Sequence, residues 1–133
     1  EKNRQPGVIR AAENLFSKIT NGTYSHIIKP IDSEDILVED AHHKRKAVQE
    51  MSRGTLEQLY LAMRFGLIDE YESRSEPLPA VLDDVFVNFD DERVETLIEV
   101  LNQFGEQRQV IVLTCHQRSL EAYKRMGANQ IMV

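Results

Sequence analysis

Residues 78–91 read L-P-A-V-L-D-D-V-F-V-N-F-D-D, a short apolar run that ends abruptly in Asp83 and Asp84. Prolines on one side and acids on the other bound the run, and this length and composition are typical of a buried parallel strand. In open α/β sheets ligands bind outside the carboxyl ends of strands, so two carboxylates there suit a metal ion or a water molecule. The stretch therefore predicts an α/β fold with a chemical site at this strand end.

A second apolar run, residues 110–114, ends at Cys115 and His116. Residues 91–105 between the two runs have the apolar spacing of a helix, which predicts a βαβ unit with parallel strands. Because neighbouring strands lie about 4.8 Å apart, we expect His116 at the same sheet edge as the two acids. Cys115 is interpreted as a small buried hydrophobe, since the pattern gives it no activating neighbour.

The remaining segments predict further elements around this unit. The spacing favours a helix over residues 6–19, a β-hairpin from residues 24–29 and 36–39, a long helix over residues 56–71, a helix over residues 119–126 and a final strand over residues 129–133. Residues 42–46, H-H-K-R-K, are interpreted either as a solvated hairpin tip or edge strand, or as a local DNA-contacting patch.

The start of the long helix carries its own signals. Thr55 and Gln58 fit a capping box, and apolar residues at core spacing predict a helix covered on most sides. Ser52, Arg53 and Gly54 just before it offer a hydroxyl, a positive charge and free backbone amides, which suit an anion. Ordinary N-capping explains the same residues.

Composition sets limits on the function. With 133 residues the chain suits one domain and is not long enough for two independent cores. Its net charge of -6 disfavours a general attraction to nucleic acid, so any nucleic-acid contact must be local or supplied elsewhere. One cysteine excludes an internal disulfide, and the absence of an apolar leader or span favours a cytoplasmic protein without a membrane partner. The start at Glu1 without methionine suggests a fragment. The chain contains no G-x-x-x-x-G-K-[ST] phosphate loop.

Four segments, in this order, resemble the C-terminal lobe of an ABC-type ATPase head of the SMC, RecF and SbcC class, and bacterial YhaN-like coiled-coil ATPases of DNA repair in particular. The matching segments are M-S-R-G-T-L-E-Q (51–58) with the signature motif, A-V-L-D-D (80–84) with Walker B, N-F-D (88–90) with the D-loop and T-C-H-Q (114–117) with the histidine switch. The resemblance implies a partial P-loop NTPase head lobe over residues 23–133, with a mainly parallel sheet flanked by helices and a β-hairpin. Residues 1–22 would be an N-terminal helix at the root of a coiled coil.

The resemblance also implies roles for single residues. Asp83 would help to hold Mg²⁺, Asp84 would orient or deprotonate the attacking water, and His116 would sense the γ-phosphate of ATP. The remaining matches would act across a dimer of heads: Ser52, Arg53 and Gly54 toward the nucleotide of the opposite head, and Asn88 and Asp90 at the interface. Two positions depart from the family pattern, because Asp84 stands where glutamate is usual and Arg53 where a small residue is common.

As a whole, the resemblance implies an ATPase that uses ATP and Mg²⁺ and couples head dimerisation to DNA repair or DNA maintenance. Its implied partners are the N-terminal P-loop lobe of the same protein, a second head in a homodimer, DNA and a nuclease. The isolated chain would be inactive without the P-loop lobe. Two alternatives stay open: a metal-dependent nuclease using Asp83, Asp84, Asp90 and His116, and a degenerate head that only binds a partner lobe or DNA.

Overall fold

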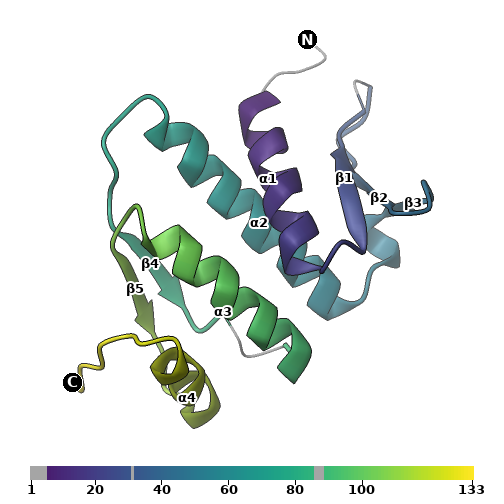
Figure 1. Ribbon diagram of the computed structural model, residues 1–133. Helices are drawn as coiled ribbons and strands as arrows, with labels where there is room; N and C mark the ends of the chain where they lie inside the picture. Colours follow the sequence, from purple (N-terminus) through teal and green to yellow (C-terminus); the bar gives the residue numbers. More distant parts are fainter. Residues whose placement is uncertain (1–5, 31, 86–88) are drawn as a thin grey trace. The chain divides into compact units, whose positions relative to one another are not determined.

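The structure is a computed structural model that describes residues 6–30, 32–85 and 89–133 (Figure 1). The chain divides into two compact units, Glu1–Glu76 and Pro77–Val133, each with its own buried apolar residues. The expectation of a single core, drawn from the chain length, was therefore wrong. The boundary falls in the polar, proline-bearing segment that follows the long helix, where few side chains can be buried.

Two helices form the core of the first unit. Helix α1 (Pro6–Ile19) and helix α2 (Arg53–Glu72) pack closely, because Gly66 on α2 lets the two backbones approach. A Cβ atom at Gly66 would lie 2.8 Å from the backbone nitrogen of Ala12 and 2.9 Å from the carbonyl oxygen of Val8. The predicted bounds of α1 are confirmed, and the helix stops where Asn21 and Gly22 take positive φ values of 53° and 81°.

Helix α2 differs from its prediction in two ways. It begins at Arg53, capped by Ser52, and Gln58 is buried and donates a hydrogen bond to the carbonyl oxygen of Ile19 at 3.1 Å. The predicted capping box of Thr55 and Gln58 was therefore wrong. The helix also leaves Tyr60 and Leu67 exposed, so it is buried along one stripe rather than on most sides. Within the described ranges, no helix is long and apolar enough to cross a membrane.

A three-stranded antiparallel sheet completes the first unit. Its order is β1 (Tyr24–Ile28), β2 (Leu37–Asp40) and β3 (Arg45–Ala47), with a short 3-10 helix η1 (Val48–Glu50) following. At the turn, the Asp40 carboxylate accepts bonds from the backbone N–H groups of Lys44 and His42, and the bond from Lys44 lowers the pKa of Asp40. Residues 42–46 thus form an exposed hairpin tip and edge strand, as one of the two interpretations predicted.

The second unit is the predicted βαβ element. Strands β4 (Ala80–Asp83) and β5 (Val110–Leu113) pair in parallel, with Ala80 opposite Val110 and Asp83 opposite Leu113. Helix α3 (Asp91–Gly105) connects them, and α4 (Gln117–Arg125) follows β5. The four α3 residues with helical spacing, Val94, Leu97, Ile98 and Leu101, are all buried. The predicted final strand at residues 129–133 was wrong, because this segment is exposed coil that pairs with no described strand.

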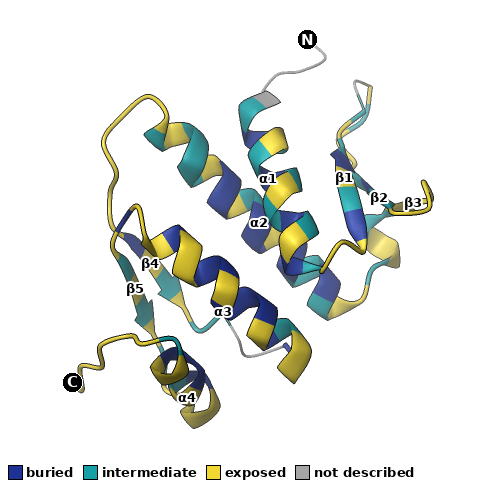
Figure 2. Cartoon of the chain, viewed as in Figure 1, coloured by how far each residue is buried: buried dark blue, intermediate teal, exposed yellow. Residues whose placement is uncertain are grey.

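Exposed residues alternate with buried or half-buried ones along the two parallel strands (Figure 2). Ala80 is buried, whereas Val81 and Leu113 are 61% and 55% exposed, and Ile111 is 40% exposed. Side chains alternate along a strand, so these three residues and Asp83 share one face. The continuous apolar run had predicted a strand buried on both faces. This expectation was wrong, because the described residues leave one face of the strand exposed.

Candidate functional site

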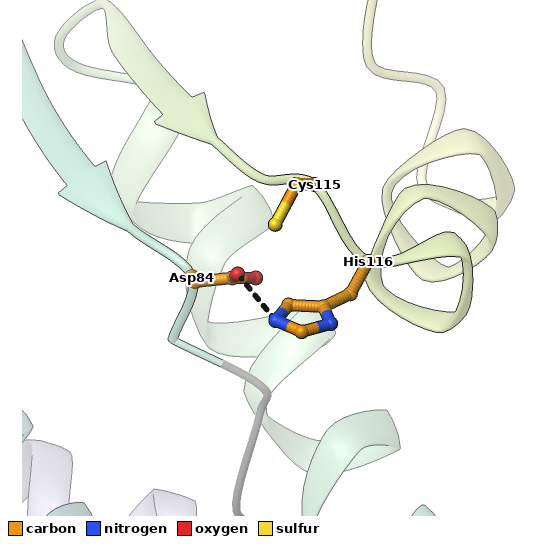
Figure 3. A group of neighbouring side chains, drawn as sticks. All are labelled: Asp84, Cys115 and His116. Carbon is orange, nitrogen blue, oxygen red and sulfur yellow. Dashed lines mark ion pairs between the residues drawn. The ribbon is translucent and has the colours of Figure 1, made fainter.

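Asp84 and His116 meet at the carboxyl ends of the two parallel strands (Figure 3). The Nε2 atom of His116 lies 3.1 Å from Oδ2 of Asp84. The Asp84 side chain is 17% exposed and that of His116 is 53% exposed, so the pair borders solvent rather than the core. The sequence-based expectation that the histidine and the acids share a sheet edge is confirmed for this pair.

Backbone geometry fixes the position of Asp84. The residue follows the last paired position of β4, and its N–H donates to the carbonyl oxygen of Leu113 at 3.0 Å. Its φ of 51° lies in the left-handed region, which aspartate tolerates better than most residues. The chain therefore turns sharply as it leaves the sheet, and the carboxylate comes to lie beside the end of β5.

Thr114 links the two strand ends. Its hydroxyl donates a 2.6 Å hydrogen bond to Oδ1 of Asp84 and accepts one from the backbone N–H of His116 at 3.1 Å. One oxygen of the carboxylate is thus held by Thr114, and the other faces the imidazole of His116. This arrangement orients both functional side chains. Sequence reasoning missed Thr114, although its place in the T-C-H-Q segment beside the predicted site was the available signal.

Two further residues belong to the surroundings of the pair. Cys115 is exposed, which corrects its interpretation as a buried hydrophobe: the chain leaves β5 after Leu113, so the thiol is free of the sheet and reaches toward Asp84 (Figure 3). Tyr123 of α4 is buried, and this burial, together with the negative charge of Asp84, raises its pKa. Sequence reasoning did not identify Tyr123, because the apolar spacing of a helix does not show which residue lies near the charge of Asp84.

Asp83 has a different environment from Asp84. It is the last residue of β4, and its side chain lies on the exposed face of the sheet with Val81. Among the described residues, the group whose donor atoms converge consists of Asp84, Cys115 and His116, and Asp83 is not in it. An exposed carboxylate at a strand end nevertheless fits Mg²⁺, a hard cation that keeps several waters and takes one or two protein carboxylates.

The segment between β4 and α3 is described only in part. Asn88 lies outside the described residues. Asp90 is the N-cap of α3: its Oδ1 accepts from the backbone N–H of Arg93 at 2.9 Å, and its Oδ2 lies 2.8 Å from Nη1 of the same arginine. Arg118 of α4 donates a 2.6 Å bond to the carbonyl oxygen of Phe89, which ties this segment to the start of α4.

The predicted anion-binding residues belong to the first unit. Ser52 is exposed, and its hydroxyl oxygen accepts from the backbone N–H of Thr55 at 3.2 Å. Gly54 is half-buried in the first turn of α2, and Arg53 is exposed with its Nε 3.3 Å from a carboxylate oxygen of Glu57. The N-capping interpretation of Ser52 is therefore confirmed, while its role toward a nucleotide stays a prediction.

Comparison with known proteins relates the chain to one curated sequence. No protein-family model matches the chain. The chain is 35% identical over 119 residues to the uncharacterized protein YhaN of Bacillus subtilis (strain 168), a match that covers 89% of this chain. It spans only 12% of the length of that relative. The activity and partners of the whole protein are therefore matters for proposal.

Solved structures with the same fold are SMC ATPase heads. A structure from a study of ATP-driven dimerisation and DNA-stimulated activation of SMC ATPases matches with a TM-score of 0.70 and 20% identity, covering 88% of this chain and 72% of that one. The SMC head domain of Thermotoga maritima matches with a TM-score of 0.65 and 20% identity, over 90% of this chain and 41% of that one. A Pyrococcus furiosus Smc head bound to the C-terminal domain of ScpA matches with a TM-score of 0.64 and 20% identity, over 88% of this chain and 30% of that one. The chain is therefore a sequence relative of part of YhaN, and its mixed α/β fold is that of SMC ATPase head domains.

Proposed function

We propose that this chain is the C-terminal half of an ATP-binding and ATP-hydrolysing head, in which ATP joins two heads and hydrolysis separates them. The observation that carries the proposal is the meeting of Asp84 and His116 at 3.1 Å, directly after Asp83, at the carboxyl edge of a parallel sheet. Ligands of open α/β sheets bind at this edge. The fold of SMC heads supports the same function.

The chemistry that this site offers is the positioning of water. Phosphoryl transfer needs little covalent participation by the protein, and depends on orienting the nucleophile and neutralising charge. Thr114 holds one oxygen of Asp84, and the other, which faces His116, would orient a water molecule and accept its proton. His116 contacts that second oxygen, and its imidazole would turn to a phosphate oxygen once a nucleotide is present.

Two further sets of residues would hold the nucleotide. Asp83 would help to hold Mg²⁺, and Mg²⁺–ATP supplies the phosphoryl group and the charge that neutralises it. The exposed N-terminus of α2, with Ser52, Arg53 and Gly54, offers a hydroxyl and backbone N–H groups that would contact the nucleotide of a second head. Asn88 and Asp90 would lie at the interface of these two heads. Each half-site is incomplete alone, so the active form would be a homodimer.

An N-terminal P-loop lobe of the same protein is the partner that this proposal requires. The chain has no phosphate loop of its own. Among the described residues its parallel sheet has two strands and an exposed apolar face, which further strands or helices could cover. A lobe that adds strands and the phosphate loop would meet both needs.

The wider role that we propose is DNA repair or DNA maintenance in the cytoplasm, with helix α1 continuing into a coiled coil. A study of related SMC ATPases concerns activation by DNA, which supports DNA as a partner of the complete protein. The net charge of -6 limits DNA contacts on this chain to a local patch such as residues 42–46. A nuclease partner would supply cleavage.

The alternative of an intrinsic metal-dependent nuclease is weakened by Asp90. Both of its carboxylate oxygens are engaged with Arg93 at the start of α3, and it does not join the donor group of Asp84 and His116. Incubation of the chain with DNA and Mn²⁺ or Mg²⁺, without nucleotide, tests this alternative directly. We expect no cleavage.

The experiment that tests the proposed function compares the chain alone with the chain joined to its N-terminal lobe. Alone, the chain should bind ATP weakly and show no turnover, because the phosphate loop is missing. Addition of the lobe should restore both binding and turnover. Rapid ATP hydrolysis by the isolated chain would overturn the proposal, and so would a complete head that binds no ATP. A complete head that binds ATP and dimerises without turnover would favour the degenerate-head alternative.

A further inference from the structure

Three different metal-binding side chains converge at the end of β5. The carboxylate of Asp84, the thiol of Cys115 and the imidazole of His116 each offer a donor atom, and these atoms lie within 4.8 Å of one another (Figure 3). Adjacent residues on a regular strand point to opposite faces, so Cys115 and His116 would not normally meet at one ligand. They do so here because the chain has left β5 at Leu113 and turns into α4 at Gln117.

We propose that Asp84, Cys115 and His116 form a binding site for Zn²⁺ or a similarly soft divalent cation. The donor set decides the class of ion: thiolate and imidazole favour Zn²⁺, whereas Mg²⁺ and Ca²⁺ prefer oxygen ligands. Three protein ligands would leave a fourth position for water, as in open zinc sites. The ion would bind the thiolate, with release of the thiol proton.

The observed distances suit such an ion. With bonds of about 2.0–2.3 Å, donor atoms around a tetrahedral Zn²⁺ stand about 3.3–3.8 Å apart. Nε2 of His116 and Oδ2 of Asp84 are already 3.1 Å apart. The thiol sulfur of Cys115 lies within 4.8 Å of the other two donor atoms, so a movement of about 1 Å would bring it to a bonding position. Cys115 and His116 are exposed, so an ion can reach them from solvent.

The surroundings of the carboxylate also favour a metal site. The hydroxyl of Thr114 donates to Oδ1 of Asp84 at 2.6 Å, and this contact leaves Oδ2 directed at Nε2 of His116. Hydrogen bonds of this kind orient ligating carboxylates in known metal sites. The proposed Zn²⁺ site shares Asp84 and His116 with the site proposed for the nucleotide, but it uses Cys115 and does not use Asp83 or Mg²⁺.

The single cysteine makes the proposal directly testable. The rate at which a thiol-specific reagent modifies Cys115 is measured on the 133-residue chain, with increasing Zn²⁺ and, separately, Mg²⁺. We expect saturating Zn²⁺ to slow modification at least about tenfold and Mg²⁺ to have no effect, because a metal-bound thiolate is shielded from reagent. Binding of Co²⁺ should also produce a thiolate-to-cobalt absorption band.

Matched variants distinguish Zn²⁺ binding at this site from Zn²⁺ binding at other histidines of the chain. His116→Gln and Asp84→Asn should each weaken the protection by Zn²⁺ at least about tenfold, in line with the loss of a ligand. The double variant His42→Gln/His43→Gln removes the adjacent histidines of the hairpin tip and should leave the protection unchanged. Circular dichroism establishes that each variant is folded. Unchanged thiol reactivity in Zn²⁺, or full protection in folded His116→Gln, would overturn the proposal.

One corollary rests on the proposed function: Zn²⁺ at this site would hold Asp84 and His116 and slow ATP turnover by the complete protein. Thiol protection does not depend on ATP, so the two proposals can fail separately. Protection without an effect on turnover would count against the role of Asp84 in hydrolysis, while the metal site would stand.

Discussion

Oδ1 of Asp84 accepts a 2.6 Å hydrogen bond from the hydroxyl of Thr114, and the two residues come from the ends of neighbouring parallel strands. This contact sets the direction of the carboxylate that faces His116. It holds the short aspartate side chain in a fixed position. Displacements of about 1 Å at a catalytic group can lower a rate about a hundredfold, so we expect the contact to matter for turnover.

Replacement of Thr114 by valine tests this contact. Thr114→Val keeps the shape of the side chain and removes the donor, so ATP turnover by the complete protein should fall by about tenfold or more. Thr114→Ser keeps the hydroxyl and should retain most of the turnover. Steady-state hydrolysis with saturating ATP measures both. Equal rates in the valine and serine variants would show that the hydroxyl does not position Asp84 for hydrolysis.

The close contact of α1 and α2 predicts a stability effect at Gly66. Alanine is the better helix former by about 1 kcal/mol, but its Cβ would lie within 3.0 Å of backbone atoms of Val8 and Ala12. We expect overpacking to dominate, so that Gly66→Ala lowers the free energy of unfolding by about 1–3 kcal/mol. Urea denaturation measures this change.

Gly105→Ala is the matched control for Gly66→Ala. A Cβ atom there would lie 3.8 Å from Cγ2 of Val110, an ordinary van der Waals distance. The change should therefore be neutral or stabilising by less than about 1 kcal/mol. Equal destabilisation by both substitutions would show that the approach of α1 and α2 is not the cause.

Substitutions of Ser52 can separate its role as the N-cap of α2 from its proposed contact with a nucleotide. Ser52→Ala removes the acceptor for the N–H of Thr55 and should lower the free energy of unfolding by about 1 kcal/mol. Ser52→Asp restores a capping oxygen but places a negative charge where the phosphate of a second head would lie. We expect this variant to be as stable as the parent and yet to lose ATP-dependent dimerisation, as measured by light scattering. Normal dimerisation of Ser52→Asp would exclude a phosphate contact at this position.

The elements with strong periodicity could be predicted from the sequence. The helical spacing of Val94, Leu97, Ile98 and Leu101 gave α3 correctly, and the two apolar runs around it gave the parallel pair and hence the meeting of Asp84 with His116. Local patterns sufficed because a helix between two strands leaves little choice of topology.

The rest depended on contacts that a single sequence does not specify. Gln58 fits a capping box, but its burial against Ile19 followed from the packing of α1 on α2. Residues 129–133, which end in three apolar side chains, look like a strand, yet a strand forms only beside a partner strand with which it can exchange hydrogen bonds. Thr114 and Cys115 joined the site through the turn after β5, which hydrophobic periodicity does not describe.

If Asp84 directs water during ATP hydrolysis, replacing its carboxylate should lengthen the lifetime of ATP-bound dimers. In the complete protein, Asp84→Asn keeps the size of the side chain, and asparagine tolerates the φ of 51° at this position. We predict that this variant binds ATP, forms dimers and fails to hydrolyse, so its dimers should outlive those of the parent at least about tenfold. Glu99→Gln, at an exposed position on α3, should behave like the parent. Dimers of Asp84→Asn that separate as fast as those of the parent, with unchanged ATP turnover, would show that Asp84 does not direct the attacking water.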